Sequence, residues 1–166
     1  MPQTEDAGSA SWVERLLIRE YEHADFDAVQ RLHVAALEHV GAYAGRGPWD
    51  SDLEDIVGSY LAAGGTFLVG VVDGTLVAMG ALRRLAPDTA ELKRMRVDPV
   101  WQGRGLGQQM LRALEAKGRE LGFRTIELET SVVQVAAQHL YIRSGYLETG
   151  RAVLKGFDCI LFRKEL

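Results

Sequence analysis

The sequence predicts one domain of mixed α/β (α+β) structure, in which strand-like and helix-like segments follow one another. The 166 residues are 47% hydrophobic and 25% charged, an ordinary globular composition at a length typical of one domain. Segments of alternating hydrophobicity are interleaved with segments whose apolar residues recur every three or four positions. Asp73-Gly74 lies between two β-rich runs, which is a strong local signal for a β-hairpin.

The N-terminal part predicts a tail, a strand and two helices. Residues 1–13 have no periodic pattern and are expected to form a disordered tail before a domain that spans 14–166. Residues 16–19 resemble a strand, and Asp25 is placed to cap the first helix. The apolar face of that helix consists of Phe26, Val29, Leu32, Ala36 and Leu37. After the glycine-rich segment 41–48, the second helix should begin at Asp50 or Ser51 and end before Gly64-Gly65. Its apolar side consists of Leu53, Ile56, Val57, Tyr60 and Leu61.

The rest of the chain predicts the remaining sheet and two more helices. The hairpin should join residues 66–72 to residues 76–85, and residues 91–97 should form the next strand. Apolar spacing predicts a helix over 104–121 that Gly122 ends. The last expected elements are a strand over 124–130, a short helix over 135–144 and a strand over 157–163.

The composition argues against several classes of protein. The net charge of −4 lacks the basic excess of a nucleic-acid binder. No apolar run reaches about 18 residues, and the first residues are acidic and polar, so neither a membrane span nor a secretory signal is expected. The single cysteine, Cys159, cannot form an internal disulfide, which fits a cytoplasmic protein. His33, His39 and His139 are scattered, so no metal site is predicted.

The charges are unevenly distributed along the chain. Residues 1–60 hold 12 acidic and 4 basic residues, whereas residues 61–166 hold 11 acidic and 15 basic ones. The acidic N-terminal part mildly favours a cationic binding partner.

A turn dense in glycine joins the strand at 91–97 to the following helix. Glycines 103, 105 and 107 let backbone N–H groups converge at a helix N-terminus, which suits a phosphate or pyrophosphate. A P-loop would need Lys-Ser/Thr after Gly107, where glutamines stand. The dinucleotide fingerprint would need glycine at position 108, although Glu127 and Glu129 follow at a suitable distance. A purely structural turn is the other alternative.

The segment Gln102-Gly103-Arg104-Gly105-Leu106-Gly107 resembles the Q/R-x-x-G-x-G/A pyrophosphate motif of the GCN5-related N-acetyltransferases (GNAT superfamily). The strand at 91–97 is similar to the family's fourth strand, and residues 136–146 are similar to its AA..LY...GF segment. The order of elements fits from about residue 15 to the end. This resemblance implies a mixed, mostly antiparallel sheet of about six or seven strands with about four flanking helices and splayed fourth and fifth strands.

The resemblance also implies acetyl-CoA as co-substrate. Its pantetheine arm would lie between the splayed strands and pair with main-chain groups around Met95 and Val97, and the Val97 N–H would face the developing oxyanion. Gln134 stands where the family often has asparagine. The residues expected to bind the coenzyme are Met95, Arg96, Val97, Gln102, Gly103, Arg104, Gly105, Leu106, Gly107, Gln108, Gln134, Ala137 and Tyr141.

Two residues are expected to move protons. Tyr141 occupies the family's general-acid position, and a core aromatic is the alternative. Glu91 is expected to be the general base and, by strand alternation, to share a face with Lys93, Met95 and Val97. A structural ion pair is the alternative for Glu91, and Glu129 is the second candidate base.

The resemblance implies an N-acetyltransferase that moves an acetyl group from acetyl-CoA to a primary amine of a small molecule or peptide, by direct attack in a ternary complex. Residues Glu38, Tyr43 and Trp49 would shape the acceptor pocket, and His39 is a further candidate for contact with the substrate. Two alternatives stay open: a non-catalytic acyl-CoA-binding sensor, and a domain that pairs with a partner through its sheet edge, for which a homodimer is possible.

Overall fold

A computed structural model describes residues 12–166 of the chain. The strands are β1 (Leu16–Glu20), β2 (Thr66–Val72), β3 (Thr75–Ala86), β4 (Thr89–Val97), β5 (Thr125–Ser131), β6 (Leu147–Leu154) and β7 (Phe157–Glu165). The α-helices are α2 (Phe26–His39), α3 (Ser51–Glu54), α4 (Leu106–Glu120) and α5 (Val135–Arg143). Shorter helical turns are η1 (His23–Asp25), η2 (Pro48–Asp50), η3 (Val57–Leu61) and η4 (Pro99–Trp101).

The seven strands form one mixed sheet in the order β1-β2-β3-β4-β5-β7-β6. Every neighbouring pair is antiparallel except β4 and β5, which run parallel. That pairing covers only three residues of each strand and ends at Glu91↔Glu127. Because β4 continues to Val97 and β5 to Ser131, the two strands separate beyond this point. The predicted mixed sheet with splayed fourth and fifth strands is confirmed.

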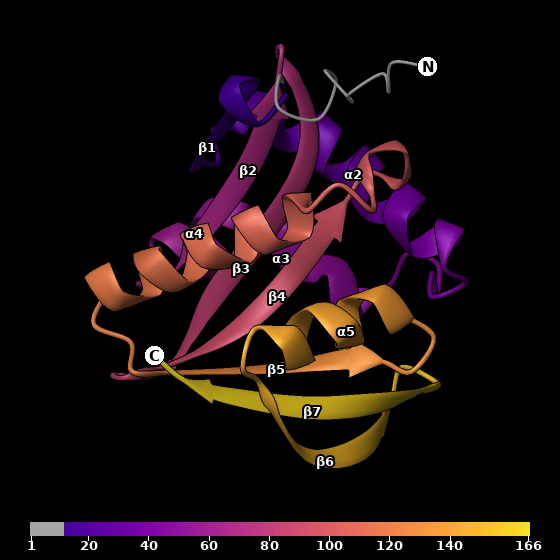
Figure 1. Cartoon of the computed structure of the whole chain (residues 1–166), viewed down its shortest axis with the longest axis vertical. Helices are drawn as coiled ribbons and strands as arrows, with labels where there is room; N and C mark the ends of the chain where they lie inside the picture. Colours follow the sequence, from indigo (N-terminus) through magenta and orange to yellow (C-terminus); the bar gives the residue numbers. More distant parts are fainter. Residues whose placement is uncertain (1–11) are drawn as a thin grey trace, which may run out of the picture.

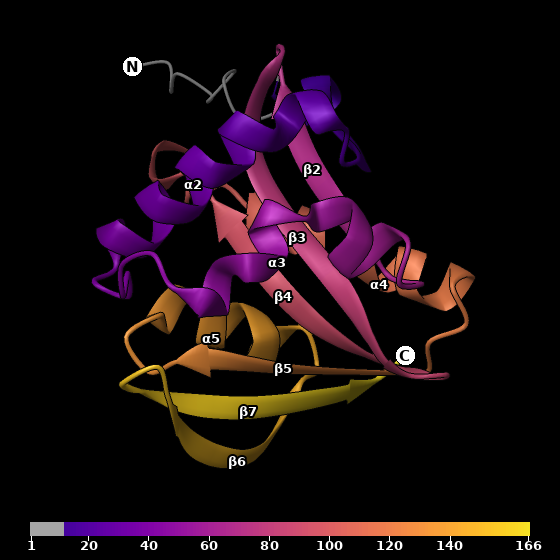
Figure 2. The ribbon, with the colours of Figure 1, turned by 180° about the vertical axis from the view of Figure 1, so that it is seen from behind.

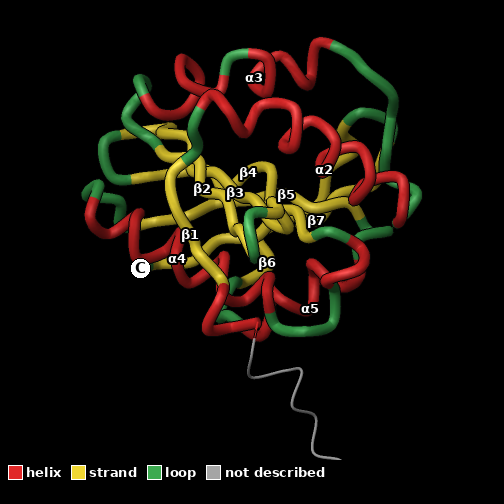
Figure 3. The backbone as a smooth tube through the Cα atoms, turned by 90° about the horizontal axis from the view of Figure 1, so that it is seen from above, coloured by secondary structure: helices red, strands yellow, loops and turns green. Residues whose placement is uncertain are grey.

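Helices cover both faces of the sheet. In Figure 1, α4 and α5 lie in front of the strands; Figure 2, from behind, shows α2 and α3 in front. Seen from above in Figure 3, the strands lie between these two layers. Side chains of β3 point alternately to the two faces of the sheet and so contribute to both cores. Leu82 packs in the core beneath α4, whereas Met79 and Ala81 pack in the core beneath α2.

The predicted hairpin and the long predicted helix are confirmed. Asp73 and Gly74 have φ values of 49° and 79° between β2 and β3, the positive-φ pair that a tight two-residue hairpin turn requires. α4 ends before Gly122, whose φ of +87° is typical of a glycine that stops a helix.

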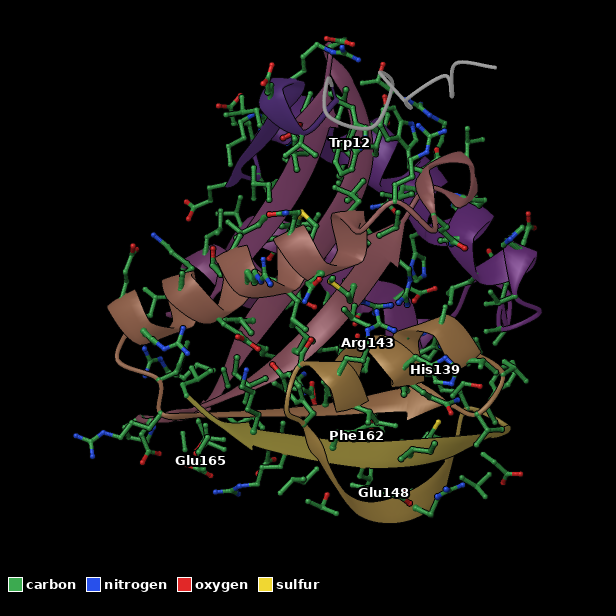
Figure 4. All side chains as sticks on the ribbon, in the orientation of Figure 1. Trp12, His139, Arg143, Glu148, Phe162 and Glu165 are labelled. Atoms are coloured by element: carbon green, nitrogen blue, oxygen red, sulfur yellow. The ribbon has the colours of Figure 1, made fainter. Side chains whose placement is uncertain are left out.

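The predicted N-terminal tail is wrong at its last two residues. Residues 1–11 lie outside the described part of the chain, but residues 12–15 form a helical turn. Trp12, labelled in Figure 4, is 3% exposed and packs edge-on against Trp101, with ring centroids 5.9 Å apart. A single buried tryptophan produces no periodicity, so the sequence pattern could not reveal it.

Asp25 precedes α2 as predicted, but its side chain does not cap that helix. The carboxylate instead accepts hydrogen bonds from the Glu22 N–H at 2.8 Å and from Arg19 at 2.8 and 2.9 Å.

The predicted second helix is broken into η2, α3 and η3. Asp55 leaves the helical region at φ −136°, and its carboxylate accepts the Gly58 N–H at 2.9 Å, which begins a new helical turn. Ile56 and Tyr60 are buried as predicted, but Val57 is 51% exposed.

β6 was not expected. It lies at the edge of the sheet, and its apolar residues Leu147 and Val153 are 73% and 70% exposed, so it lacks the alternation that marks a half-buried strand. Over residues 12–166, no helix has the length and apolar character needed to cross a bilayer.

Candidate active site

An open cleft lies where β4 and β5 separate. Residues 91–96 of β4 and 129–131 of β5 form its walls. Side chains from α2 and the loop after it line one side, the β6–β7 turn lines another, and Tyr141 of α5 faces the interior. Its empty volume, including the open mouth, is about 930 Å³.

A bulge in β4 decides which side chains face the cleft. Ala81 pairs with Lys93 and Met79 pairs with Arg96, so one residue of β3 lies opposite two residues of β4. Arg94, at the bulge, has the left-handed φ of 58°. The extra residue reverses the alternation, because Arg96 now shares the α2 face with Lys93.

The expectation that Glu91 shares a face with Met95 and Val97 is therefore wrong. Met95 and Val97 pack against the core beneath α4. The charged residues of β4, which are Glu91, Lys93, Arg94 and Arg96, all line the cleft on the α2 side.

Arg94 fastens the loop before α3 to β4. Its guanidinium donates to Asp50 Oδ1 at 3.0 Å, to Asp52 Oδ2 at 2.9 Å and to the Trp49 carbonyl at 2.7 Å. Burial alone would raise the pKa of Asp52, but the hydrogen bonds and charge of Arg94 outweigh it and lower that pKa to about 2. Sequence patterns assigned Arg94 no role, although two aspartates two residues apart and a run of cations were visible.

The glycine turn before α4 is shaped to accept an anion. Gly103 and Gly105 have φ values of +76° and +84°, and no atom lies within 4 Å of the position that a Cβ would take at either residue. The first N–H groups of α4 have no partner within the helix. Leu106 is 1% exposed and packs in the core beneath α4, so its side chain is not available to a ligand. A pyrophosphate fits these features.

The turn adjoins the end of β4. Gln102 Nε2 donates to the Val97 carbonyl at 3.2 Å, and the Arg104 guanidinium lies 4.9 Å from the centre of the Trp101 ring. A Cβ on Gly107 would lie 3.7 Å from Val97 and 3.3 Å from Leu140 of α5.

The other expected coenzyme residues lie near this junction. Gln134 lines the cleft, Ala137 packs against the core beneath α4, and Gln108 lies half-buried in the first turn of α4. Contact of each of these residues with the coenzyme remains a prediction.

Tyr141 packs against two aromatic rings, and its hydroxyl has no hydrogen-bond partner among residues 12–166. Its ring packs against Tyr146 and Phe162, with centroid distances of 5.7 and 6.2 Å. Burial raises its pKa to about 12, against a smaller opposing effect of the Arg96 charge. Within residues 12–166 no hydrogen bond engages the hydroxyl, although the side chain is only 5% exposed.

The two candidate bases differ in their partners. Glu91 accepts a hydrogen bond from Arg83 at 2.8 Å and lies 3.8 Å from Lys93 Nζ. Glu129 is exposed at the cleft, and its carboxylate has no ion pair or hydrogen bond with any described residue.

The histidine at the cleft is His33, not His39. His39 and His139 are exposed and lie outside the cleft lining. His33 is buried, with Nε2 3.2 Å from Asp50 Oδ1 but without the geometry of a hydrogen bond. Burial, together with the charges of Arg96 and Arg94, lowers its pKa to about 4, so His33 is neutral at pH 7.

The predicted pocket residues are only partly brought together. Tyr43 and Trp49 line the cleft, whereas Glu38 is exposed outside it. Cys159 is buried as expected, and burial raises the pKa of its thiol. Its position in the cleft lining, like that of Lys155 and Phe157, was not foreseen.

Known proteins are similar to this chain in sequence. The family model described as "Acetyltransferase (GNAT) family" matches residues 26–146. N-acetyltransferase 8F1 of Rattus norvegicus is 31% identical over 112 residues, which cover 64% of this chain and 51% of that protein. Aminoglycoside N(6′)-acetyltransferase type 1 of Stenotrophomonas maltophilia is 32% identical over 114 residues, covering 63% and 74%. The chain spans about half the length of the first curated relatives it matches.

Solved structures share its fold. An acetyltransferase from Streptococcus agalactiae superposes with a TM-score of 0.84 at 20% identity, covering 92% of this chain and 99% of that one. An acetyltransferase from Salmonella typhimurium, solved with acetyl-CoA, has a TM-score of 0.76 at 21% identity and covers 91% and 94%. The family match, on a fold with splayed central strands, shows that this chain belongs to the acetyltransferase (GNAT) family.

Proposed function

We propose that the chain is an acetyl-CoA-dependent N-acetyltransferase that acetylates a primary amine of a small molecule or peptide by direct attack in a ternary complex. The observation that carries this proposal is the gap between β4 and β5, which lies beside the glycine turn. The hydroxyl of Tyr141 lies in this gap and forms no hydrogen bond with any of residues 12–166. Membership of the family supports it.

The residues of the turn and of β4 would hold the coenzyme. The N–H groups of residues 105–107 would bind its pyrophosphate, with Arg104 adding charge. The Asp98 N–H donates to Val77 of β3 at 2.8 Å, so alternation turns the Val97 N–H away from β3 and toward the gap, where it would donate to the thioester carbonyl. Bound acetyl-CoA supplies an acetyl group activated as a thioester.

Tyr141 would act as the general acid. Its hydroxyl keeps its proton at neutral pH, because burial raises its pKa to about 12. A donor that has no other partner in the described chain is suited to protonate a departing thiolate.

The attacking amine must first lose a proton, because an alkylammonium has a pKa near 10.4. Glu129 is the better placed acceptor of that proton, since it has no competing cation among residues 12–166, whereas Glu91 has two. We therefore place Glu129 before Glu91 as candidate base, which reverses the order expected from the sequence.

Release of free thiol from acetyl-CoA tests the proposal. The purified chain is incubated with acetyl-CoA and a broad amine panel, with amine-free samples as a control for hydrolysis. We expect amine-dependent thiol release that falls in Glu129→Gln more than in Glu91→Gln. Binding of acetyl-CoA without thiol release for any amine would instead identify an acyl-CoA-binding module.

A further inference from the structure

Within residues 12–166, Arg96 is a half-buried cation without an anionic partner. It lies on the α2 face of β4 and lines the cleft. Its guanidinium donates one hydrogen bond, from Nη1 to the Met95 carbonyl, at 2.8 Å. Its Nε is buried without any partner, and no carboxylate of the described chain lies within ion-pair distance. Burial and the neighbouring Arg94 charge lower its pKa to about 10, so Arg96 is still charged at pH 7.

The carboxylates around Arg96 are engaged elsewhere. Asp50 and Asp52 bind Arg94, and Glu91 binds Arg83. The acidic residues that suggested a cationic partner are thus neutralised where they reach the cleft.

Withdrawing part of a charged group from water without a partner is costly, and the Nε of Arg96 is buried in this way. The planar guanidinium fork matches a carboxylate, with two parallel N–H···O bonds. Arg96 has most of its N–H groups uncommitted within the described chain, so it is prepared for an anion that residues 12–166 do not supply.

The coenzyme phosphates do not meet this requirement. Their proposed site is the glycine turn at the N-terminus of α4, against the α4 face of the sheet. Arg96 was expected among the coenzyme residues, but its side chain lies on the opposite face, near His33 of α2 and Tyr141, so a contact with the coenzyme would involve its main chain.

The other side of the cleft offers the opposite charge. Glu129 of β5 is exposed and unpaired within residues 12–166, and it faces the same cleft as Arg96 of β4. The cation and the anion lie on two strands that have separated, and neither has a charged partner among residues 12–166. Together they complement a zwitterion.

We infer that the acceptor is a free amino acid or a similar small molecule that carries both an amine and a carboxylate, with the carboxylate bound by Arg96 and the ammonium group by Glu129. The inference rests on the proposed acetyltransferase function and specifies its substrate class.

Matched substrates test the inference. Free amino acids are compared with their carboxamides and with the corresponding decarboxylated amines, and kcat/KM is measured from thiol release. We expect the carboxylate forms to be favoured by about 30-fold or more, the effect of a buried, hydrogen-bonded charge pair.

The matched variants are Arg96→Met and Arg112→Met, the second of which removes an exposed charge from α4. Arg96→Met should bring the acid-to-amide ratio close to one through a higher KM for the acid, with little change for the amide. Because it removes a half-buried charge that has no partner among residues 12–166, it should fold and have a Tm at least equal to that of the wild type. Arg112→Met should keep the wild-type ratio.

Three results would overturn the inference. The first is a preference for neutral amines or polyamines, and the second is an unchanged acid-to-amide ratio in Arg96→Met. The third is an equal fall in kcat/KM for all amines in that variant, which would mean that Arg96 acts only through Tyr141.

Calorimetry of amino acids and their amides in the presence of coenzyme A separates this inference from the proposed function. If no amine is acetylated, the proposed function fails. Equal binding of acid and amide then also rejects the inference, and carboxylate-selective binding that depends on Arg96 supports it.

Discussion

Two buried tyrosines that touch each other have different roles. The Tyr146 hydroxyl donates to Glu115 at 3.1 Å, and Glu115 also binds Lys164 at 3.0 Å, so Tyr146 belongs to a closed structural network. The Tyr141 hydroxyl has no such partner among residues 12–166 and faces the cleft. Burial raises the pKa of both, but only Tyr141 has a proton to give to a bound molecule.

Replacing each tyrosine by phenylalanine separates these roles. Tyr141→Phe should lower kcat about 100-fold, because it removes the proposed proton donor, and should leave the Kd for acetyl-CoA almost unchanged. Tyr146→Phe should lower the free energy of unfolding by about 1 kcal/mol and leave kcat unchanged. Steady-state kinetics and urea unfolding of both variants provide the test. An equal loss of kcat in the two variants would contradict the acid role of Tyr141.

At the scale of one element, β4 shows what sequence patterns capture. Its location and its loss of pairing with β5 were expected, but strict alternation assigned the wrong faces after Lys93. Strict alternation through Arg94 would turn Arg96 into the apolar core beneath α4, a conflict that indicates a bulge. β6 gave no usable signal, because its partly buried positions include the small residues Gly150 and Ala152, whereas its large apolar residues Leu147 and Val153 are exposed.

The glycine turn allows a controlled test of the coenzyme site. Gly105 and Gly122 both have positive φ, and at both the position that a Cβ would take has no atom within 4 Å. Alanine at either residue should cost about 1 kcal/mol of stability, because L-residues disfavour this region. Gly105→Ala alone should also weaken acetyl-CoA binding, by about tenfold or more, because its methyl group obstructs approach to the helix amides. Calorimetry measures both Kd values, and equal values would reject the turn as the phosphate site.

The Arg94 cluster, formed by Arg94, Asp50 and Asp52, should dominate the stability of the loop before α3. Arg94→Met leaves the two aspartates without their cation and should cost about 3 kcal/mol or more, as expected for breaking a buried ion pair. Arg83→Met breaks a pair whose arginine is 43% exposed and should cost less than about 1 kcal/mol. Urea unfolding measures both changes; equal losses would show that the Arg94 cluster is not held by charge.

At the scale of the whole molecule, most of the individual helices and strands followed from hydrophobic periodicity and turn residues, whereas the mixed sheet with its flanking helices was implied by the resemblance to the GNAT family. Hydrophobic periodicity and turn residues did not predict which side chains meet in the cleft. Tyr141 and the glycine turn were identified through motifs. The pairing of Arg94 with two aspartates, and the lack of such pairing at Arg96 and Glu129 within residues 12–166, depend on contacts between residues distant in sequence.

Global stability should depend on pH through His33. Its pKa is about 4 in the folded chain and near 6.5 when unfolded, so the unfolded state binds more protons between these values. The free energy of unfolding should therefore fall, by up to about 3 kcal/mol, as the pH drops from 6.5 to 4.

His33→Gln should flatten this slope, since glutamine does not titrate. His139→Gln, at an exposed position on α5 labelled in Figure 4, should retain it. Urea unfolding at a series of pH values gives the comparison. A slope that is the same in all three proteins would assign the proton uptake to other groups.

The bulge at Arg94 has an evolutionary consequence. Removing this single residue would restore regular alternation and leave Lys93, Met95 and Arg96 on the faces that they now occupy, but it would also remove the ion pairs that join the strand to Asp50 and Asp52. Relatives that keep both aspartates should therefore keep the extra residue, whereas relatives without them should tolerate a one-residue gap at this point of an alignment.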